Sequence, residues 1–304
     1  MTVLEAIQKS ADFLGKKGIE SPRLQAELLL AHLLKMPRMK LYLNFERVLT
    51  PAETDALRDV VKRRGLREPV QHIIGSTSFC GFEISVNRNA LVPRPETELL
   101  AELGWQFLST LNSQLSTALD FGTGTGCIAI ALAAKCPSAK IIATDISSDA
   151  LVLAGENAAR NQVAERIEFV QSDGFKILVD RWGGRPREPK ANSQDSSPEV
   201  SPAHFDLIIS NPPYIPTAEI ETLEPEVKNF DPRGALDGGP DGLDFYRMFA
   251  RQAKPFLKPQ GKIMLEFGDG QAEAIRRMFE DEKWIVEAVK DDYSQRERIF
   301  IAKI

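Results

Sequence analysis

The first 70 residues carry apolar side chains at helical spacing, broken at intervals by helix-capping residues. Thr2 and Thr50 each stand three positions before a glutamate, the pattern of a capping box, and Ser21 stands before a proline, as an N-cap residue often does. Leucine, isoleucine, valine and alanine then recur every three or four positions. The pattern predicts three or four short helices that form a small bundle over residues 1–70.

Residues 71–95 show a different pattern, in which apolar and polar positions alternate around Gly81. Alternation of this kind is typical of short strands, and a glycine between two of them favours a tight turn. We therefore expect a β-hairpin linker over residues 71–95 that joins the helical bundle to the rest of the chain.

From residue 96 onward, apolar runs of strand length alternate with helical patterns. The predicted strands span residues 117–121, 140–144, 166–170, 205–210, 261–267, 284–289 and 298–302. Regular alternation predicts an α/β domain over 96–304 with a doubly wound seven-stranded sheet, in which the last two strands form an antiparallel pair. The helix before the fifth strand is expected to run to Leu257. Residues 181–203 hold four prolines and four serines without periodicity, which predicts a flexible insertion.

The composition is that of a globular protein large enough for two domains. The chain has 304 residues, 43% of them hydrophobic, and no apolar run approaches the roughly 18 residues of a membrane span. The N-terminal segment lacks a hydrophobic signal core and the three cysteines form no Cys-x-x-Cys pair, so we expect a cytoplasmic protein with free thiols. The three histidines are scattered, so no metal site is predicted.

A glycine-rich loop follows the predicted strand at 117–121 and precedes a helical pattern. Its residues are Gly122, Thr123, Gly124, Thr125 and Gly126. Glycines let the backbone turn tightly and approach a ligand closely at a helix N-terminus. The Gly-x-Gly-x-Gly spacing differs from the Gly-x-Gly-x-x-Gly of dinucleotide enzymes, which favours S-adenosylmethionine over NAD as the cofactor.

Two acidic residues at the ends of the next strands are candidates for further cofactor contacts. Asp145 follows the strand at 140–144, where its carboxylate can accept both hydroxyls of a ribose. The alternative is that Asp145 only caps the next helix. Asp173, followed by Gly174, stands after the strand at 166–170 and could reach an adenine amino group.

Asn211, Pro212, Pro213 and Tyr214 follow the apolar strand at 205–210. Two prolines cannot continue a β-ladder, so the chain must leave the sheet there, at the edge where open α/β sheets bind ligands. The Asn211 carboxamide and the Pro212 carbonyl can accept N–H bonds, and the Tyr214 ring can stack on a flat group. These residues predict a site for a planar nitrogen of an amide or aromatic amine; the alternative is a turn without chemistry.

The order of these motifs resembles that of Rossmann-like S-adenosylmethionine-dependent methyltransferases. The chain as a whole is similar to the HemK/PrmC family, the release-factor N5-glutamine methyltransferases. The matching stretches are residues 71–75, 91–98, 122–126, 211–215 and 231–243. The most specific is Pro-Arg-Pro-Glu-Thr-Glu at 93–98, in which Arg94 and Glu96 are expected to contact the substrate.

The resemblance implies methyl transfer from S-adenosylmethionine to the side-chain amide nitrogen (N5) of the glutamine in the Gly-Gly-Gln motif of peptide-chain release factors. The helical domain would dock this protein substrate, with no direct contact to nucleic acid or membrane. Asn211, Pro212 and Tyr214 would be the catalytic residues, because they would hold the amide in line with the methyl group, and no general base is assigned. Asn211 would also contact the cofactor.

Three positions depart from the family pattern. Cys80 stands where the hairpin usually has tyrosine. Gly174 replaces an aromatic residue, which moves the expected cofactor contact to Phe175. Gln295 stands at the glycine of an Asp-x-x-Gly-x-x-Arg motif, a replacement that bears on the shape of this loop.

Three other functions remain alternatives. A sister enzyme could methylate a glutamine of a ribosomal protein instead. A DNA adenine-N6 methyltransferase also presents Asn-Pro-Pro-Tyr to a planar NH₂ group, but it needs a basic recognition surface. Residues 1–70 hold 13 Lys and Arg against 9 Asp and Glu while the whole chain has net charge −5, so residues 71–304 carry −9. An inactive cofactor-binding scaffold is disfavoured by the intact glycine loop and Asn211.

Overall fold

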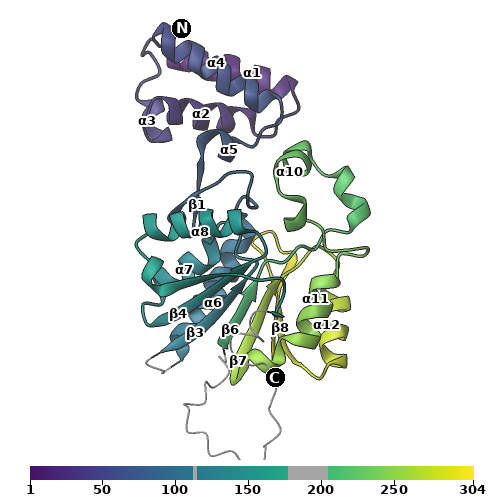
Figure 1. Cartoon of the computed structure of the whole chain (residues 1–304). Helices are drawn as coiled ribbons and strands as arrows, with labels where there is room; N and C mark the ends of the chain where they lie inside the picture. Colours follow the sequence, from purple (N-terminus) through teal and green to yellow (C-terminus); the bar gives the residue numbers. More distant parts are fainter. Residues whose placement is uncertain (112–114, 177–204) are drawn as a thin grey trace, which may run out of the picture. The chain divides into compact units, whose positions relative to one another are not determined.

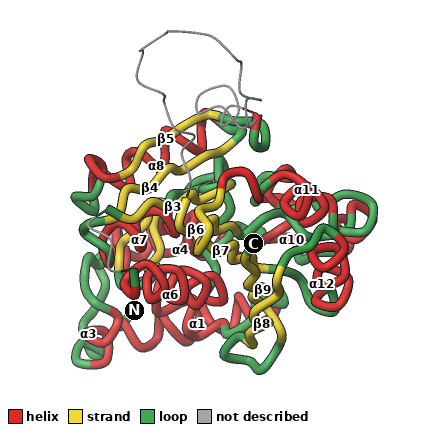
Figure 2. Tube along the Cα trace, turned by 90° about the horizontal axis from the view of Figure 1, so that it is seen from below, coloured by secondary structure: helices red, strands yellow, loops and turns green. Residues whose placement is uncertain are grey.

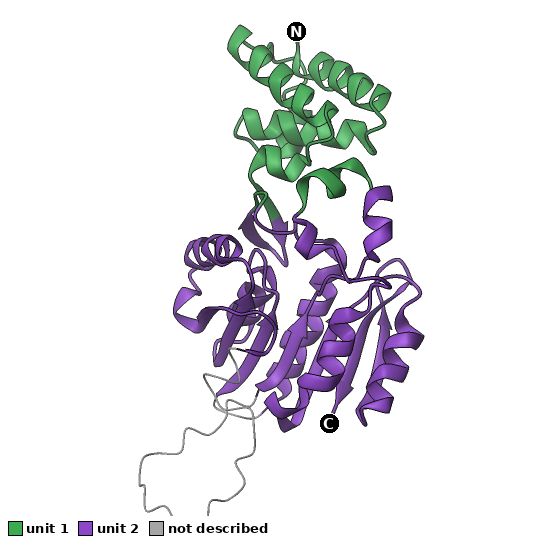
Figure 3. Ribbon diagram, turned by 45° about the vertical axis from the view of Figure 1, so that its right-hand side comes forward, with its two compact units in different colours: residues 1–77, 86–88, 223–231 green, residues 78–85, 89–222, 232–304 purple. Residues whose placement is uncertain are grey.

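The structure, a computed structural model, describes residues 1–111, 115–176 and 205–304 (Figure 1). The described chain packs into two compact units, coloured separately in Figure 3. The first unit comprises residues 1–77, 86–88 and 223–231, and the second comprises residues 78–85, 89–222 and 232–304. The predicted division of the chain at residues 70 and 95 stays a prediction, and the predicted insertion at 181–203 lies outside the described residues.

The first unit is a helical bundle, as predicted. Its helices are α1 (Val3–Lys16), α2 (Pro22–Leu33), α3 (Arg38–Tyr42), α4 (Pro51–Gly65), α5 (Val70–Ile74) and α10 (Pro225–Phe230). The first five enclose a core of aliphatic side chains in which Leu14, Leu29 and Leu41 are fully buried. Burial of this apolar face, more than intrinsic propensity, holds helices this short in place.

Helix α10 belongs to this unit although it lies far along the chain. Arg64 on α4 is buried and its Nη2 pairs with Glu226 Oε1 at 2.6 Å, while Arg67 Nη2 lies 2.7 Å from Glu226 Oε2. A buried arginine needs a partner of opposite charge. Among the described residues, Glu226 of α10 is the carboxylate that pairs with Arg64. Nothing in the sequence pattern predicted the contact.

Two of the three predicted helix caps are confirmed. Thr2 and Thr50 each accept a hydrogen bond from the backbone N–H of the glutamate three residues on, and that glutamate accepts one from the cap's own N–H. For Ser21 the predicted position before α2 is confirmed, but its backbone is left-handed (φ 47°) and its side chain makes no capping bond. Pro22 still suits the first position of α2, where it has no N–H that needs a partner.

The predicted hairpin is present as strands β1 (Ser76–Phe79) and β2 (Phe82–Ser85). Cys80 and Gly81 form its turn with φ angles of 51° and 84°, the two positive values that a type I′ turn requires. The Cys80 N–H donates to Glu98 Oε1 at 2.9 Å. The turn therefore forms with a cysteine at the position where the family pattern has tyrosine.

The second unit is built on a seven-stranded sheet, which confirms the predicted α/β class. Its strands are β3 (Ser116–Phe121), β4 (Ala139–Asp145), β5 (Ile167–Gln171), β6 (Phe205–Ser210), β7 (Leu257–Glu266), β8 (Ile285–Asp291) and β9 (Glu297–Lys303). They lie in the order β5-β4-β3-β6-β7-β9-β8 (Figures 1 and 2). The first five are parallel, and β9 is antiparallel to both β7 and β8, so the predicted antiparallel pair is confirmed.

Helices cover both faces of the sheet, as Figure 2 shows. Helices α6 (Pro95–Thr110), α7 (Cys127–Lys135) and α8 (Ser148–Arg160) pack along one face, and α11 (Asp244–Gln252) and α12 (Ala272–Asp281) along the other. Helix α6 approaches β6 closely at Gly104, where a Cβ atom would come within 2.9 Å of the Ile209 side chain. Pro95 is the first residue of α6, and Glu96 and Glu98 lie in its first turn.

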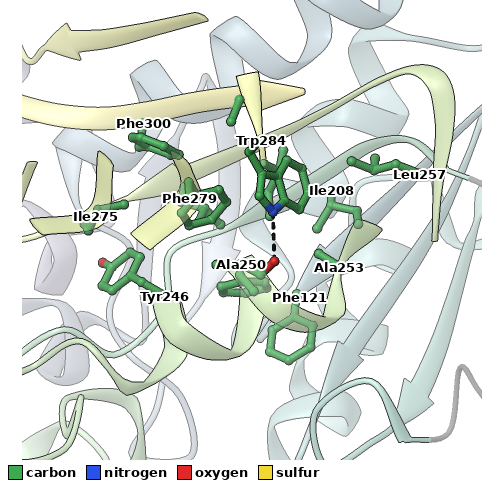
Figure 4. Packing of buried hydrophobic residues seen from close by; sticks show 14 of the residues in the cluster. Phe121, Ile208, Tyr246, Ala250, Ala253, Leu257, Ile275, Phe279, Trp284 and Phe300 are labelled. Carbon is green, nitrogen blue, oxygen red and sulfur yellow. Dashed lines mark hydrogen bonds between the residues drawn. The ribbon is translucent and has the colours of Figure 1, made fainter. Parts of the chain in front are cut away.

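The core under α11 and α12 is rich in aromatic rings (Figure 4). Phe279 lies between Trp284 and Phe300, and the Trp284 indole N–H donates to the Ala250 carbonyl at 2.8 Å. The helix predicted to reach Leu257 ends at Gln252 instead, because Pro255 and the start of β7 at Leu257 interrupt it. Within the described ranges, no helix has both the length and the apolar character that a membrane span requires.

Candidate active site

A cavity of about 290 Å³ opens beyond the carboxyl ends of the parallel strands β3, β4, β5 and β6. Most of the predicted site residues line it: Arg94, Gly122, Thr123, Gly124, Thr125, Asp145, Asp173, Gly174, Asn211, Pro212 and Pro213. The remaining three, Glu96, Gly126 and Tyr214, lie outside its wall. The topology explains the gathering, because parallel strands bring their carboxyl ends to one edge.

The glycine loop is held from behind by a buried carboxylate. Asp120, the next-to-last residue of β3, accepts a hydrogen bond from the Thr123 hydroxyl at 2.6 Å and another from the Ala129 N–H at 3.1 Å, both at Oδ2. Its Oδ1 is buried without a partner in the described chain. Burial raises the pKa of Asp120 to about 7, and the nearby Asp145 carboxylate adds to the rise against the two hydrogen bonds.

Asp145, at the end of β4, anchors the front of the same loop. Its Oδ2 accepts from the Gly124 N–H at 2.9 Å, and its Oδ1 accepts from the Ser147 N–H at 2.9 Å. The cap of α8 is Ser147, whose hydroxyl accepts from Ala150 N–H, so the alternative role of Asp145 as helix cap is wrong. A carboxylate has about four acceptor positions, so Asp145 retains capacity for hydroxyl donors in the cavity.

Gly126 supports the loop without facing the cavity. It precedes α7 with φ 82°, and a Cβ atom there would meet the Ala154 Cβ on α8 at 3.0 Å. Behind it, the buried Asn157 donates to the carbonyls of Thr125 and Ser85, both at 3.0 Å. The loop is therefore fixed against α8 and β2 as well as against the sheet.

The segment after β5 corrects one prediction. Asp173 is exposed and Gly174 is half-buried with φ 63°, and both line the cavity. The expected transfer of a cofactor contact to Phe175 is wrong: its ring is 2% exposed and stacks on Phe256 at 5.1 Å between ring centres. Gly174 forms a left-handed turn, and the next residue, Phe175, packs into the apolar core. Burial of its ring in the core stabilises the fold.

Asn211 leaves β6 with its carboxamide fixed from one side. Its Nδ2 donates to the Thr97 hydroxyl at 3.0 Å, and that hydroxyl donates to Glu266 Oε2 at 2.7 Å. Both Thr97 and Glu266 are buried, and Asn211 lines the cavity. The amide oxygen of Asn211 is therefore turned away from Thr97 and is available as an acceptor.

Tyr214 is held by the loops around it. Its carbonyl accepts from Gln271 Nε2 at 2.9 Å, and a Cβ atom on Gly242 would approach that carbonyl oxygen to 2.3 Å. The ring packs against the aromatic core, and burial together with the Glu266 carboxylate raises the pKa of the phenol to about 12. Tyr214 thus fixes the turn that carries Asn211, and its stacking on a substrate plane stays a prediction.

Sequence reasoning missed several residues at this cavity. Thr97 at the start of α6 and Phe245 and Met248 on α11 all line it. Phe245 and Met248 stand three positions apart on one face of a helix, a spacing that could have been noticed. The Thr97 hydrogen bonds had no local signal, because their partners lie 114 and 169 residues away.

The cavity fits an adenosine-type cofactor such as S-adenosylmethionine. At Gly122, which lines it with φ 71°, a Cβ atom would meet nothing within 4 Å, so the backbone itself borders open space there. Asp145 and Asp173 supply acceptors on one side and Ile146, Phe245 and Met248 supply apolar surface. In residues 1–111, 115–176 and 205–304, no group of three or more His, Cys, Asp or Glu side chains could hold a metal ion.

Comparisons with known proteins agree with this architecture. Residues 5–75 match the model of the PrmC N-terminal domain, and residues 104–182 match the methyltransferase small domain. Release factor glutamine methyltransferases are similar over almost the whole chain. The protein from Geobacter sulfurreducens is 39% identical over 91% of this chain and 88% of its own, and that from Chlorobaculum tepidum is 40% identical over 98% and 95%.

The chain belongs to the release factor glutamine methyltransferase family. The fold alone is shared more widely. The hMettl16 catalytic domain, solved in complex with MAT2A 3′UTR hairpin 6, superposes with a TM-score of 0.54 at 14% identity, covering 81% of this chain and 82% of its own. The family assignment therefore rests on the sequence relatives, which extend through both the helical unit and the sheet.

Gln295 shows how this family member forms a loop without the expected glycine. The residue adopts φ 60°, the left-handed conformation that glycine favours. Asp292 still closes the loop, since its Oδ1 accepts from the N–H groups of Ser294 and Arg296 and its N–H donates to the Arg296 carbonyl. Arg298 donates from Nη1 to the Phe267 carbonyl at 2.9 Å. The loop thus keeps the backbone conformation that glycine would favour, and Gln295 is strained in that conformation.

Proposed function

We propose that this enzyme transfers the methyl group of S-adenosylmethionine to the side-chain amide nitrogen of the glutamine in the Gly-Gly-Gln motif of a release factor. The observation that carries the proposal is that one cavity is lined both by the glycine loop with Asp145 and by Asn211 with its prolines. The names of the family relatives point to the same substrate.

The cofactor is proposed to lie along the glycine loop. The backbone of Gly122 and Gly124 would lie against one side of the cofactor. Asp145 would accept hydrogen bonds from the ribose hydroxyls, and Asp173 would accept one from an adenine N–H. Bound S-adenosylmethionine would supply a sulfonium methyl group that is already activated for transfer. Gly174 borders the same region.

The role of Asn211 follows from the weak nucleophilicity of an amide nitrogen, whose lone pair is delocalised into its carbonyl. An enzyme for such a group needs alignment more than a strong base. The Asn211 oxygen and the Pro212 carbonyl would accept the two amide N–H groups and favour positive charge on the nitrogen as its new bond forms. Pro212 and Pro213 restrict the backbone, so these acceptors are in place before the substrate arrives.

The remaining predicted contacts belong to the protein substrate. Arg94 lines the cavity, Glu96 lies two residues further on at the start of α6, and Tyr214 would border the amide plane. The helical domain is proposed to dock the release factor. The three free cysteines suit a reducing compartment, and we propose the cytoplasm as the place of the reaction.

The direct test is to incubate the full chain with isotope-labelled S-adenosylmethionine and a purified release factor. Mass spectrometry then locates the modified residue, with a release factor whose motif glutamine is replaced by alanine as the matched control. We expect label on that glutamine alone and none on the control. Label on a ribosomal protein or on adenine-containing DNA, with none on the release factor, would contradict the proposal.

A further inference from the structure

A chain of two hydrogen bonds leads from a buried carboxylate to the Asn211 carboxamide. Glu266, the last residue of β7, is 1% exposed, and its Oε2 accepts a hydrogen bond from the Thr97 hydroxyl at 2.7 Å. Thr97, 3% exposed on α6, accepts in turn from Asn211 Nδ2 at 3.0 Å. Three separate elements thus meet at the Asn211 amide group, which borders the cavity.

The direction of these bonds is fixed by how many protons each group has. A threonine hydroxyl has a single proton, and a carboxylate can only accept. Because the Thr97 hydroxyl donates its one hydrogen bond to Glu266, its oxygen can only accept from Asn211, and only the NH₂ end of the carboxamide can donate to it. The oxygen end of the carboxamide must then point the other way.

We propose that Glu266 and Thr97 are positioning residues that decide which end of the Asn211 carboxamide faces the substrate amide. This inference rests on the proposed function, in which the Asn211 oxygen accepts an N–H of the target glutamine. Neither residue touches the reacting atoms. They act by keeping the wrong end of Asn211, its NH₂ group, away from the substrate's own NH₂ group.

The arrangement reverses if Glu266 gains a proton. A protonated carboxyl can donate to the Thr97 oxygen, and the Thr97 hydroxyl is then free to donate to Asn211. The best partner for that proton is the Asn211 oxygen, which requires the carboxamide to turn over and present its NH₂ group to the cavity. Two N–H donors would then face each other, and binding of the target amide in line would be lost.

The charged groups around Glu266 come from every side of its pocket. Arg298 on β9 and Arg94 at the start of α6 favour the carboxylate, whereas Glu96 opposes it, and the phenols of Tyr214 and Tyr246 lie nearby. The Tyr246 hydroxyl donates to the Glu266 carbonyl at 2.8 Å. Burial is the largest influence and raises the pKa of Glu266 to about 7, against the Thr97 hydrogen bond and the arginines.

The first test separates turnover from binding. Thr97→Val keeps the shape but removes the hydroxyl, Thr97→Ser restores it, and Glu266→Gln removes the charge and the titration while it keeps one oxygen acceptor for the Thr97 hydroxyl. Thr110→Val on the exposed end of α6 and Glu102→Gln on the same helix are the matched controls. We expect Thr97→Val to lower kcat by about 10–100-fold, with KM and cofactor affinity within about 3-fold of wild type.

Thr97→Ser should recover most of the rate, and the pH profile should separate the two positions. The wild-type rate is expected to rise as pH increases through about 7, where Glu266 ionises, and the Glu266→Gln rate should lose that rise. A folded Thr97→Val enzyme with a kcat within 2-fold of wild type would overturn the proposal. So would a Glu266→Gln enzyme with the wild-type profile.

The second test needs no substrate, so it is independent of the proposed function. The side-chain NH₂ signals of Asn211, identified by their loss in Asn211→Ala, report its hydrogen bond to Thr97 in an NMR spectrum of the full chain. They should shift and exchange faster in Thr97→Val but not in Thr110→Val. Unchanged signals would contradict the hydrogen-bond chain itself. A wild-type enzyme that does not methylate release factors would instead remove the proposed function and this role of the chain together.

Discussion

The two sides of the cavity are held in place by different means. On the glycine-loop side, Thr123, Ala129 and Gly124 bond to aspartates 3, 9 and 21 residues away. On the Asn211 side, the supporting bonds join residues 114, 169 and 57 positions apart, from Asn211 to Thr97, from Thr97 to Glu266 and from Gln271 to the Tyr214 carbonyl. The aspartate bonds of the first side span short stretches of the chain, with further support from Asn157 on α8, whereas the bonds of the second side join elements far apart in the sequence.

The difference in how the two sides are supported matches their proposed roles in cofactor binding and substrate positioning. A cofactor site built from backbone N–H groups and one strand-end aspartate uses two adjacent strands, their loops and the helices that follow. A substrate site that must aim one end of an amide needs fixed partners, and buried side chains on rigid elements supply them. The first two predictions below each disrupt one side, so that the effect on the other can be measured.

The largest effect is expected from Asn211→Ala. The variant removes the acceptor that matters most once positive charge develops on the nitrogen, so kcat should fall by about 10²–10³-fold, as for a removed oxyanion-hole group. Cofactor affinity should change little, because the glycine loop and Asp145 carry it. Single-turnover assays measure the rate, and titration calorimetry measures the cofactor affinity. Near-normal kcat with poor cofactor binding would make Asn211 a cofactor contact only.

Asp145→Ala should weaken the other side. It removes the proposed ribose acceptor and the partner of the Gly124 N–H, so cofactor binding should lose about 1.5–3 kcal/mol, the scale of hydrogen bonds to charged groups. Calorimetry with S-adenosylmethionine checks this, with Asp149→Asn on α8 as a nearby control. Unchanged affinity would contradict the ribose assignment.

Asp120→Asn should change how stability depends on pH. The folded-state pKa of Asp120 is raised to about 7, so the folded protein holds this proton more tightly than the unfolded chain. Stability from this group is therefore present at low pH and is lost as pH rises from about 4 to 7. Removing the titration should reduce the loss between pH 5 and pH 7 by about 2 kcal/mol.

Urea unfolding of wild type and Asp120→Asn at the two pH values measures that difference, and the exposed Asp59→Asn is the matched control. Glu266 titrates in the same range and remains in both proteins, so it does not affect the comparison. Equal slopes in wild type and variant would contradict the assignment of Asp120 as a buried group that binds a proton on folding.

The smallest effect concerns a region outside both sides. Gln295→Gly should stabilise the protein by up to about 1 kcal/mol, because glycine adopts φ 60° without the Cβ strain that glutamine bears. Thermal unfolding should show a rise of a few degrees at most. A lower melting temperature would show that the Gln295 side chain, not the backbone shape, stabilises this loop.

The comparison of the two sides also explains how much of the molecule could be predicted from its sequence. The glycine loop, Asp145 and the seven strands were predictable, because strand periodicity and short-range turn chemistry determine them. The capping boxes at Thr2 and Thr50 followed for the same reason, whereas Ser21 shows that a cap pattern does not determine the backbone of its residue.

What could not be predicted depends on distant residues. Thr97 and Glu266 come together only through the packing of α6 beside β7, and α10 joins the helical unit through Glu226 and two arginines of the bundle. Phe175 was assigned to the cavity because sequence alone does not say which side of a turn faces the core. Each of these is a tertiary contact whose residues have no distinctive neighbours in the chain.

The central claim is that one side of the cavity binds the cofactor and the other aims the substrate amide. Single-turnover rates on a release factor, measured across a full range of S-adenosylmethionine concentrations, test it most directly in Asp145→Ala and Asn211→Ala. We predict that Asp145→Ala recovers most of the wild-type rate at saturating cofactor, whereas Asn211→Ala stays about 10²–10³-fold slow at every concentration. Recovery of Asn211→Ala at high cofactor concentration would contradict the account.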